Sequence, residues 1–493
     1  MKKRLHNIMF AGTGSDVGKS IVATAFCRIF RQDGYQPAPF KAQNMALNSY
    51  ATPEGLEIGR AQAAQAEAAG IPCHTDMNPL LLKPQSDHTS QVVLNGKPLG
   101  NKDAYDYWRN KGSGSIDFRQ EVCAAFDRLA ARHNPIVMEG AGSISELNLR
   151  DTDLVNLPMA RHAHADVILV GDIDRGGIFA SVYGSITLQS AEDRRLIKGI
   201  IINKFRGDLR LFDQGRQMLE DICHVPVLGV IPYFHHIHID EEDSVSLQRK
   251  RHHPVEGKVN VAVVQLPHIS NFTDFDTLER DPRVNLFYTT DTTYIQTADI
   301  IILPGTKATL ADLQTLRRNG CAQAVVNAHS EGRMVVGICG GYQMLGLTVS
   351  DPQGIEGEAT TMDGLSLLPI HTVITPTKTT RQVTFTFDGY QCHGYEIHQG
   401  RSEGESEEAS FLKQGHCLGT YIHGFLDNAP VIEWLLDVRE FQSSKFKVQS
   451  SRVPKSESSK VQTFNRNQQY DQLADHVRRH VDIDRIYHIL SHD

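Results

Sequence analysis

The sequence lacks three features that would place it in a specialised class of protein. Its eight cysteines are scattered and include no Cys-x-x-Cys pair, which argues against a disulfide framework and a structural zinc site. No apolar run approaches the roughly 18 residues that cross a membrane. Lysine and arginine total 50 against 58 aspartates and glutamates, so the net charge is −8, without the basic excess typical of nucleic-acid binders.

These absences favour a cytoplasmic chain that acts on small molecules, with neither a membrane nor a nucleic acid as its partner. The first ten residues are basic and then apolar, but the apolar part is too short for a signal peptide. A length of 493 residues with 40% apolar content predicts two or three folded domains. The sequence does not indicate an oligomeric state.

One pattern recurs along the chain: a short apolar run, then glycine or another turn residue, then a stretch compatible with a helix. Continuous apolar runs are typical of strands buried on both faces of a parallel sheet, and amphipathic segments such as 20–31 and 118–133 would cover the sheet. The runs are 7–12, 135–140, 166–171 and 198–203, and in a second series 259–266, 298–304, 333–339, 394–398 and 419–423.

The predicted fold class is therefore α/β, with two domains that are each a mainly parallel sheet flanked by helices. We expect the first domain at 1–232 and the second at 259–440, joined by a histidine-rich, solvated linker at 233–258. Residues 441–463 are rich in serine and lysine and predict a flexible loop. Residues 464–493 predict a closing helical segment.

A glycine-rich loop between the first strand and the first helix predicts a nucleotide site. Its backbone N–H groups and the helix N-terminus would hold phosphate oxygens, while Lys19 contacts the β and γ phosphates and the Ser20 hydroxyl binds Mg²⁺. The spacing departs from the usual form, because Thr13 stands where the first glycine is expected. The expected nucleotide contacts in this loop are Gly12, Thr13, Gly14, Gly18, Lys19 and Ser20.

Polar residues at the ends of later strands are candidates for the rest of this site. Glu139 ends a buried strand, and a carboxylate there can reach a metal ion at a neighbouring phosphate loop. Asp151 and Asp153 follow it, and their spacing does not decide which is a second acid near the metal. Asn203 ends the fourth strand and could contact a purine edge, although an asparagine there is more often a turn former.

The second domain contains a candidate catalytic thiol. Gly337-Ile-Cys339-Gly-Gly341 follows an apolar strand and has the Gly-x-Cys-x-Gly form of a nucleophile elbow, in which a sharp turn presents the sulfur beside N–H groups that can hold an oxyanion. His423 ends a later strand at the same edge of the predicted sheet and is the candidate base. Cys339 and His423 are thus the predicted catalytic pair.

A nucleotide site and a reactive thiol in one chain favour an ATP-driven amidation. ATP can phosphorylate a carboxylate, which is otherwise a poor electrophile, and ammonia can then displace the phosphate. The ammonia would come from glutamine, whose amide Cys339 attacks to form a thioester. Free ammonia is mostly protonated at neutral pH, which is a reason to place both reactions in one chain.

Several strings resemble known families. The loop 12–20 is similar to that of the dethiobiotin synthetase group of P-loop enzymes, and 337–346 with 421–424 resembles class I glutamine amidotransferases. Together with five further strings, they resemble the cobyric acid synthase family over nearly the whole chain. Those strings are Lys41–Asn48, Asn78–Ser86, Asp172–Gly177, Asn203–Asp208 and Gly394–His398.

The resemblance implies an enzyme that uses ATP, Mg²⁺ and glutamine to amidate the b, d, e and g carboxylates of adenosylcobyrinic a,c-diamide, a corrinoid of the adenosylcobalamin pathway. It also favours Asp151 over Asp153 as the second acid. The residues implied for the catalytic pair, the phosphates and the metal are Cys339, His423, Lys19, Ser20, Glu139 and Asp151. Corrin contacts from 45–49 and 81–91 are a further hypothesis.

The chain departs from the expected patterns at three places. The usual class I triad has a glutamate two residues after the histidine, but this position is Phe425, as expected for this subgroup, so the residue that orients His423 is open. Residues 143–145 differ from the expected string beside Glu139. Residues 304–308 also differ, which puts a possible oxyanion contact in doubt.

Three other functions fit part of the sequence. A cobyrinic acid a,c-diamide synthase shares both half-sites but is not expected to carry the string 41–48. A ParA-like partition ATPase would need a dimerising switch and usually a basic surface, and it leaves the thiol site unexplained. A degenerate amidase that serves as a scaffold is the third.

Overall fold

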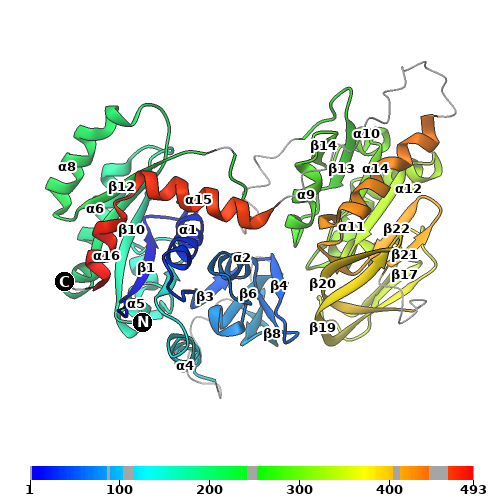
Figure 1. Cartoon of the computed structure of the whole chain (residues 1–493). Helices are drawn as coiled ribbons and strands as arrows, with labels where there is room; N and C mark the ends of the chain where they lie inside the picture. The colour runs from blue at the N-terminus through cyan, green and yellow to red at the C-terminus, as the bar shows by residue number, and fades with distance from the viewer. Residues whose placement is uncertain are drawn as a thin grey trace.

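The computed structural model describes residues 3–85, 89–103, 116–234, 236–240, 252–403, 411–443 and 465–491. Within these ranges the chain forms two α/β halves that lie side by side, each built around a mainly parallel sheet (Figure 1). The fold class predicted from the sequence is therefore confirmed.

The first half is built around a six-stranded parallel sheet in the order β12-β11-β10-β1-β9-β2. Its central strand β1 packs Ile8 and Phe10 on one face and Met9 and Ala11 on the other, which is why the run must be continuously apolar. The strands are β1 Asn7–Gly12, β2 Ala38–Phe40, β9 Ile136–Glu139, β10 Ala165–Asp172, β11 Ile197–Phe205 and β12 Val227–Pro232.

Helices cover both faces of this sheet. On one face α1 buries Phe26 and Phe30, and on the other α4 buries Phe126. Residues 57–59 pair as a strand, and the alanine-rich helix α2 begins directly after them at Arg60. The helices of this half are α1 Lys19–Gln32, α2 Arg60–Ala69, η1 Thr75–Met77, α4 Phe118–Ala130, η2 Leu147–Thr152, α5 Leu157–His162, α6 Ile178–Thr187, α7 Ala191–Leu196, η3 Leu209–Phe212 and α8 Asp213–Cys223.

The part of the chain that connects β2 to α4 forms two small sheets, which were not predicted from the sequence. One has the order β3-β6-β7-β8, and the other is the β4–β5 pair. Several of these strands have only three residues, too few to show an alternating pattern. Their bounds are β3 Gln43–Met45, β4 Ser49–Ala51, β5 Glu57–Gly59, β6 Leu80–Pro84, β7 Thr89–Leu94 and β8 Lys97–Asp103.

The expected closing segment is a helix pair, α15 (Arg466–His480) and α16 (Ile483–Ser491), and it packs on the first half. Leu473 and Leu490 lie in the same core cluster as α1, and Arg28 of α1 is 2.7 Å from the Asp471 carboxylate. Figure 1 shows this red pair beside the blue β1 and α1. The last helices therefore complete the layer that covers the first sheet.

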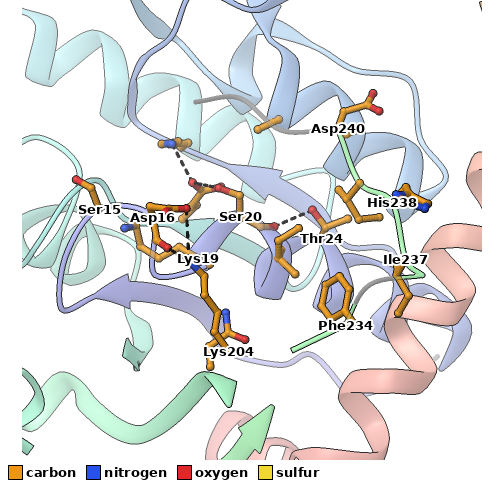
Figure 2. Close-up of a pocket in the computed structure, with 18 of the residues that line it drawn as sticks. Ser15, Asp16, Lys19, Ser20, Thr24, Lys204, Phe234, Ile237, His238 and Asp240 are labelled. Carbon is orange, nitrogen blue, oxygen red and sulfur yellow. Dashed lines mark hydrogen bonds and ion pairs between the residues drawn. The ribbon is translucent and has the colours of Figure 1, made fainter. Parts of the chain in front are cut away.

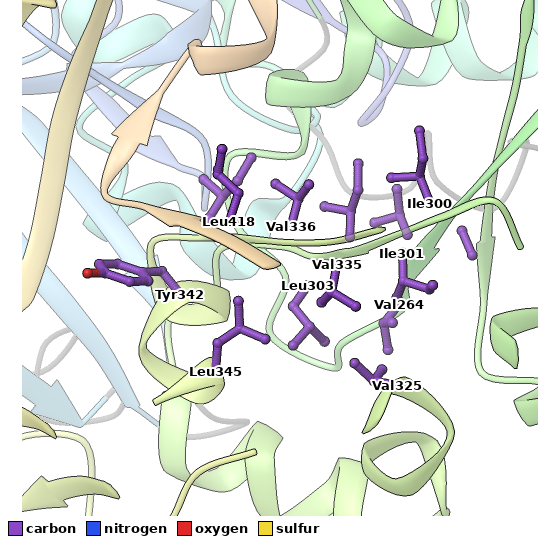
Figure 3. Packing of buried hydrophobic residues seen from close by; sticks show 14 of the residues in the cluster. Val264, Ile300, Ile301, Leu303, Val325, Val335, Val336, Tyr342, Leu345 and Leu418 are labelled. Atoms are coloured by element: carbon purple, nitrogen blue, oxygen red, sulfur yellow. The ribbon is translucent and has the colours of Figure 1, made fainter. Parts of the chain in front are cut away.

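The second half is built around a sheet in the order β14-β13-β15-β16-β22-β21, parallel except for its edge strand β21. Branched side chains from β15 and β16, including Ile301 and Val335, form its core (Figure 3). The elements are β13 Val259–Val264, η5 Phe272–Phe275, α9 Asp276–Glu279, β14 Val284–Thr289, α10 Thr292–Thr297, β15 Ile300–Leu303, α11 Thr309–Arg318, α12 Cys321–Ser330, β16 Met334–Ile338, α13 Gly340–Leu345, β21 Phe411–Gln414, β22 Cys417–Thr420, η6 Phe425–Asp427 and α14 Ala429–Ser443.

A second, mixed sheet in the order β18-β17-β19-β20-β23 flanks this core. The run 394–398, which we expected in the parallel series, lies instead in the long antiparallel hairpin of β19 and β20. One side of that hairpin is exposed, so its apolar residues alternate. Its elements are β17 Thr348–Asp351, β18 Thr360–Asp363, β19 His371–Phe387, β20 Tyr390–Glu403 and β23 Ile422–His423.

The two halves meet through buried ionic and aromatic contacts. Glu57 of β5 is 2.8 Å from the Lys83 ammonium and also pairs with Lys378 of β19. Burial alone would raise the pKa of Glu57, but the charges of Lys378 and Lys83 lower it well below its ordinary value. The rings of Tyr50 and Tyr395 lie 4.5 Å apart at their centroids. These contacts hold the long hairpin against the small sheets of the first half.

The two predicted connections lie partly outside the described residues. In the predicted flexible loop 441–463, α14 ends at Ser443 and the remainder lies outside the described ranges. In the predicted linker, 235 and 241–251 lie outside them. None of the helices in the described part of the chain combines the length and the apolar character that a membrane crossing requires.

Candidate active sites

The predicted phosphate loop connects β1 to α1 and lines a cavity (Figure 2). Gly18 has a φ of 95°, which favours glycine, and a Cβ there would lie 2.0 Å from the Asn203 side chain. The Thr13 N–H donates to the Val170 carbonyl (3.0 Å), so β-type pairing continues through the position where the first glycine is usual. The loop is thus built without that glycine.

Lys19 lies with its amine against the backbone of the loop. Its side chain is buried, and Nζ donates to the carbonyl oxygens of Gly14 (2.8 Å) and Gly142 (3.0 Å). A Cβ on Gly12 would lie 2.8 Å from this Nζ, so glycine at position 12 leaves room for the amine. Phosphate oxygens can replace these carbonyl acceptors, which suits the predicted role of Lys19.

Glu139 ends β9 with its carboxylate buried beside the loop. Its Oε1 accepts hydrogen bonds from the Ser20 hydroxyl and the Lys41 ammonium (both 2.8 Å), and its Oε2 accepts one from Gln65 (2.7 Å). Burial would raise the pKa of Glu139, but the Lys41 charge and these hydrogen bonds lower it below its ordinary value. The carboxylate is therefore held in its ionised form.

The oxygens of Ser20 and Glu139 fit the predicted Mg²⁺. This ion prefers hard oxygen ligands and usually binds through one or two carboxylates together with substrate phosphates and water. Across the described residues, no group of three or more His, Cys, Asp or Glu side chains is arranged to hold a metal. An ion held here would therefore depend on the nucleotide for much of its coordination.

The structure does not bring the predicted second acid to this pair. Asp151 is exposed on η2 and does not line the cavity. Asp153 instead accepts the backbone N–H groups of Val155 (2.7 Å) and Asn156 (3.0 Å). Neither acid is therefore among the residues that line the cavity with Ser20, and Asp153 has a local structural role.

Asn203 lies at the end of β11, against the phosphate loop. Its Nδ2 donates to the Val17 carbonyl (2.9 Å), which supports the loop at Gly18. It also lines the cavity, as do Pro232 and Phe234. Contact between Asn203 and a purine remains a prediction.

The cavity, about 950 Å³ in volume, extends from the phosphate loop to the second half of the chain. Residues 237–240, which we expected in a solvated linker, line it. The side chain of Asp240 is 5% exposed and accepts a hydrogen bond from Arg60 Nε (3.0 Å), which gives the buried arginine of α2 an opposite charge. The wall from the second half consists of Phe272, Asp276, Glu279 and Arg280.

Cys339 forms the predicted elbow between β16 and α13. Its φ is 53°, a strained value for a residue other than glycine, and its N–H donates to the Thr420 carbonyl (2.8 Å). The turn packs so tightly that a Cβ on Gly341 would lie 2.0 Å from the Leu303 carbonyl oxygen. Cys339 is 8% exposed, and its Sγ is 3.7 Å from the Ile397 carbonyl oxygen.

A candidate oxyanion donor lies beside this elbow. A Cβ on Gly340 would be 3.1 Å from the Thr306 backbone nitrogen, so that nitrogen lies close to the residue after the thiol. The Thr306 hydroxyl lies within hydrogen-bond distance of Asp312 and of the His268 carbonyl and can donate to either one, which fixes the loop. Residues 304–308 differ from the expected string, but a backbone nitrogen that can donate to an oxyanion is still present at this position.

His423 lies on β23, just beyond the end of β22, and is oriented by Asp274. Its Nδ1 is 2.7 Å from Asp274 Oδ2, while Asp274 Oδ1 accepts the Gly424 N–H (2.9 Å). Burial lowers the pKa of His423, but the charge of Asp274, their hydrogen bond and the interaction with Cys339 raise it to about 10. Asp274 therefore orients His423, a role that the usual class I triad gives to a glutamate at the position that Phe425 holds here.

Comparisons with known proteins agree with this two-part architecture. The model for a CobQ/CobB/MinD/ParA nucleotide binding domain matches 8–246, and that for a CobB/CobQ-like glutamine amidotransferase domain matches 260–431. The cobyric acid synthase of Phocaeicola vulgatus is 61% identical, over 100% of this chain and 99% of its own. Those of Parabacteroides distasonis and Syntrophobacter fumaroxidans are 52% and 47% identical, with at least 99% of both chains covered.

The chain belongs to the cobyric acid synthase family. The relatives align across both halves, so the resemblance seen in the sequence motifs is confirmed. A ParA-like partition ATPase would leave the amidotransferase half unmatched.

Several residues at or near the two sites were not predicted from the sequence. Asp274 was missed because it is far from His423 in the sequence and no motif marks it. Lys41 opens a string that carried the resemblance, but no role was assigned to it. Gln65 and Gln62 are buried polar residues on the alanine-rich α2, and glutamines three residues apart on one face of such a helix were a usable signal.

The hypothesis that 45–49 and 81–91 contact a corrin receives little support. Met45 lines the cavity and is 52% exposed. Asn48, Ser49 and Lys83 are buried, the first two against the second half of the chain. Of the described residues in both stretches, Met45 alone is exposed.

Proposed function

We propose that this chain uses ATP and glutamine to convert the b, d, e and g carboxylates of adenosylcobyrinic a,c-diamide into amides in the adenosylcobalamin pathway. One observation carries the proposal: relatives named cobyric acid synthase match the full chain, which contains both a Cys–His–Asp arrangement and a phosphate loop. ATP supplies the energy for each amide, and glutamine supplies the nitrogen. Eight free thiols suit the reducing cytoplasm, where we place the reaction.

In the amidotransferase half, Cys339 attacks the side-chain amide of glutamine. His423 holds the proton of the pair as an imidazolium, which its raised pKa and the Asp274 carboxylate both favour, so that Cys339 attacks as the thiolate. N–H groups of Gly340 and Thr306 are placed to stabilise the oxyanion. His423 then gives the proton to the departing ammonia, and water hydrolyses the thioester to glutamate.

In the synthetase half, the acceptor carboxylate attacks the terminal phosphate of ATP. Lys19 contacts the phosphates, and Ser20 with Glu139 would hold Mg²⁺, which neutralises phosphate charge when bound. Lys41 forms an ion pair with the Glu139 carboxylate and lines the cavity, where its charge can attract the acceptor. Ammonia displaces phosphate from the acyl phosphate, so each cycle yields an amide, ADP, phosphate and glutamate.

Mass spectrometry of the corrinoid product tests the proposal. The full chain is incubated with adenosylcobyrinic a,c-diamide, ATP, Mg²⁺ and glutamine, and four successive mass steps are expected. A matched reaction with cobyrinic acid distinguishes the a,c-diamide synthase, which would produce two steps from that acceptor. Absence of any step with either acceptor would overturn the proposed amidation.

A further inference from the structure

The short helix η5, with the residues on either side of it, lies between the two candidate sites. It follows β13, and the chain enters it through Asn271, which has a φ of 52°. It continues directly into α9. Its residues Phe272, Thr273, Asp274 and Phe275 are all buried, so the segment is packed on both sides.

One side of η5 holds the catalytic histidine. Asp274 uses both of its carboxylate oxygens on β23 and the residue after it, one on the His423 ring (2.7 Å) and one on the Gly424 N–H (2.9 Å). A shift of η5 would change both contacts together. The position of the imidazole therefore depends on the position of this segment.

The other side of η5 is seated on the synthetase half. Asn271 Oδ1 accepts the Ser49 N–H (2.9 Å), and the Phe272 N–H donates to Asn48 Oδ1 (3.2 Å). Both partners are fully buried, and the Asn48 carbonyl also accepts the Arg60 N–H (3.2 Å) at the start of α2. The segment is thereby tied to the helix whose Gln65 binds Glu139.

The same segment reaches the nucleotide cavity. Phe272 and Asp276, two residues on either side of Asp274, line the cavity that also contains Lys19 and Ser20. A ligand in the cavity can therefore contact η5 directly. Ligands shift a conformational equilibrium by the difference in their contacts with the two states, and these residues provide such a difference.

We infer that η5 makes glutamine hydrolysis dependent on the synthetase half, because Asp274 orients His423 only when Asn271 and Phe272 are seated on Asn48 and Ser49 and cavity ligands favour that seating. This inference rests on the proposed function. It gives Asp274 a positioning role for His423. It also places the control of ammonia release in a segment that contacts both sites.

The experiment compares glutamine hydrolysis by the full chain with and without cavity ligands. The probes are β,γ-methylene-ATP with Mg²⁺ and the a,c-diamide acceptor. Stimulation of glutamate formation by about 5- to 150-fold is expected, the usual range for coupling between two sites. Wild-type protein that amidates its acceptor yet shows no stimulation would overturn the inference and leave the proposed function standing.

Asn271→Gly tests the seating itself. Glycine keeps the left-handed backbone and removes the oxygen that accepts the Ser49 N–H. We expect stimulation to fall to less than twofold, while synthesis from ammonium salt stays unchanged. Asn95→Gly is the matched control, since Asn95 also has a positive φ (47°) and lies outside the cavity lining. Unchanged stimulation in Asn271→Gly would contradict the inference.

A binding measurement keeps the inference testable if Asn271→Gly folds poorly. Coupling between two sites is reciprocal, so a covalent glutamine analogue on Cys339 must change nucleotide affinity. The wild-type chain is treated with 6-diazo-5-oxonorleucine, and the Kd of β,γ-methylene-ATP is measured before and after. A tighter Kd is expected after the treatment, without a set relation to the size of the rate stimulation because reciprocity applies to binding and not to rates, and an unchanged Kd would refute the coupling.

Discussion

The two candidate sites are assembled in different ways. The phosphate site depends mainly on nine consecutive residues, 12–20, because a loop between a strand and a helix directs its own N–H groups at one point. The thiol site collects Cys339, His423 and Asp274 from three separated segments. A local motif can be recognised without the fold, whereas a site of the second kind is complete only after three separated segments of the second half have packed together.

The largest expected effect comes from removal of the thiol, which should stop the use of glutamine and leave the phosphate site active. Cys339→Ser should eliminate glutamine-dependent synthesis, since loss of a nucleophile costs on the order of 10⁶-fold in comparable enzymes. Synthesis from high ammonium salt should continue, because the phosphate site is untouched. Both rates are measured by product mass spectrometry, and full glutamine-dependent activity in this variant would remove Cys339 from the mechanism.

Asp274→Asn tests whether the thiol site needs its distant third residue. The amide cannot stabilise an imidazolium, so kcat for glutamine hydrolysis should fall by about 10²–10⁴-fold with a smaller change in KM. The pKa of His423 should also fall toward its ordinary value, which is measured by histidine NMR. An unchanged pH profile would show that Asp274 is only a packing residue.

The sequence predicted the features that depend on neighbouring residues and missed those that depend on packing between distant segments. Apolar runs such as 7–12 predicted the parallel strands because burial on both faces leaves a continuous pattern. The three-residue strands at 43–45 and 57–59 carry no such pattern and were missed. Asp274 could not be paired with His423, since an acid 149 residues away meets it only through the packing of η5 beside β23. Local periodicity thus predicts elements, and tertiary packing decides partners.

The interface between the halves offers a stability test. Glu57→Ala would leave Lys83 and Lys378 buried without their carboxylate, and breaking a buried pair in this way costs about 3–5 kcal/mol. We expect a lower Tm by calorimetry. Glu433→Ala, which removes a partner of Arg283 at a partly exposed pair, is the control and should change Tm little. Equal changes in both variants would mean that the interface charges do not stabilise the chain.

Lys19→Ala tests the phosphate site, whose loss should affect both nitrogen sources. Removal of one donor to developing charge typically costs about 10²–10³-fold, so synthesis from glutamine and from ammonium salt should fall equally. Basal glutamine hydrolysis should remain, because Lys19 lies in the first half of the chain and Cys339 in the second. A fall in glutamine-dependent synthesis alone would indicate that Lys19 acts on the transfer of ammonia.

The smallest effect concerns pH and links the His423–Asp274 pair to stability. The pKa of His423 is raised from 6.5 to about 10 in the folded chain, so the unfolded chain loses this proton first as the pH rises. The stabilisation is complete below pH 6.5 and is lost as the pH rises toward 10, with a slope of about 1 kcal/mol per pH unit between pH 7 and 9. Denaturant unfolding at several pH values measures it. Asp274→Asn should remove this slope because a buried histidine without a carboxylate stays neutral, and an identical slope in both proteins would show that other groups cause it.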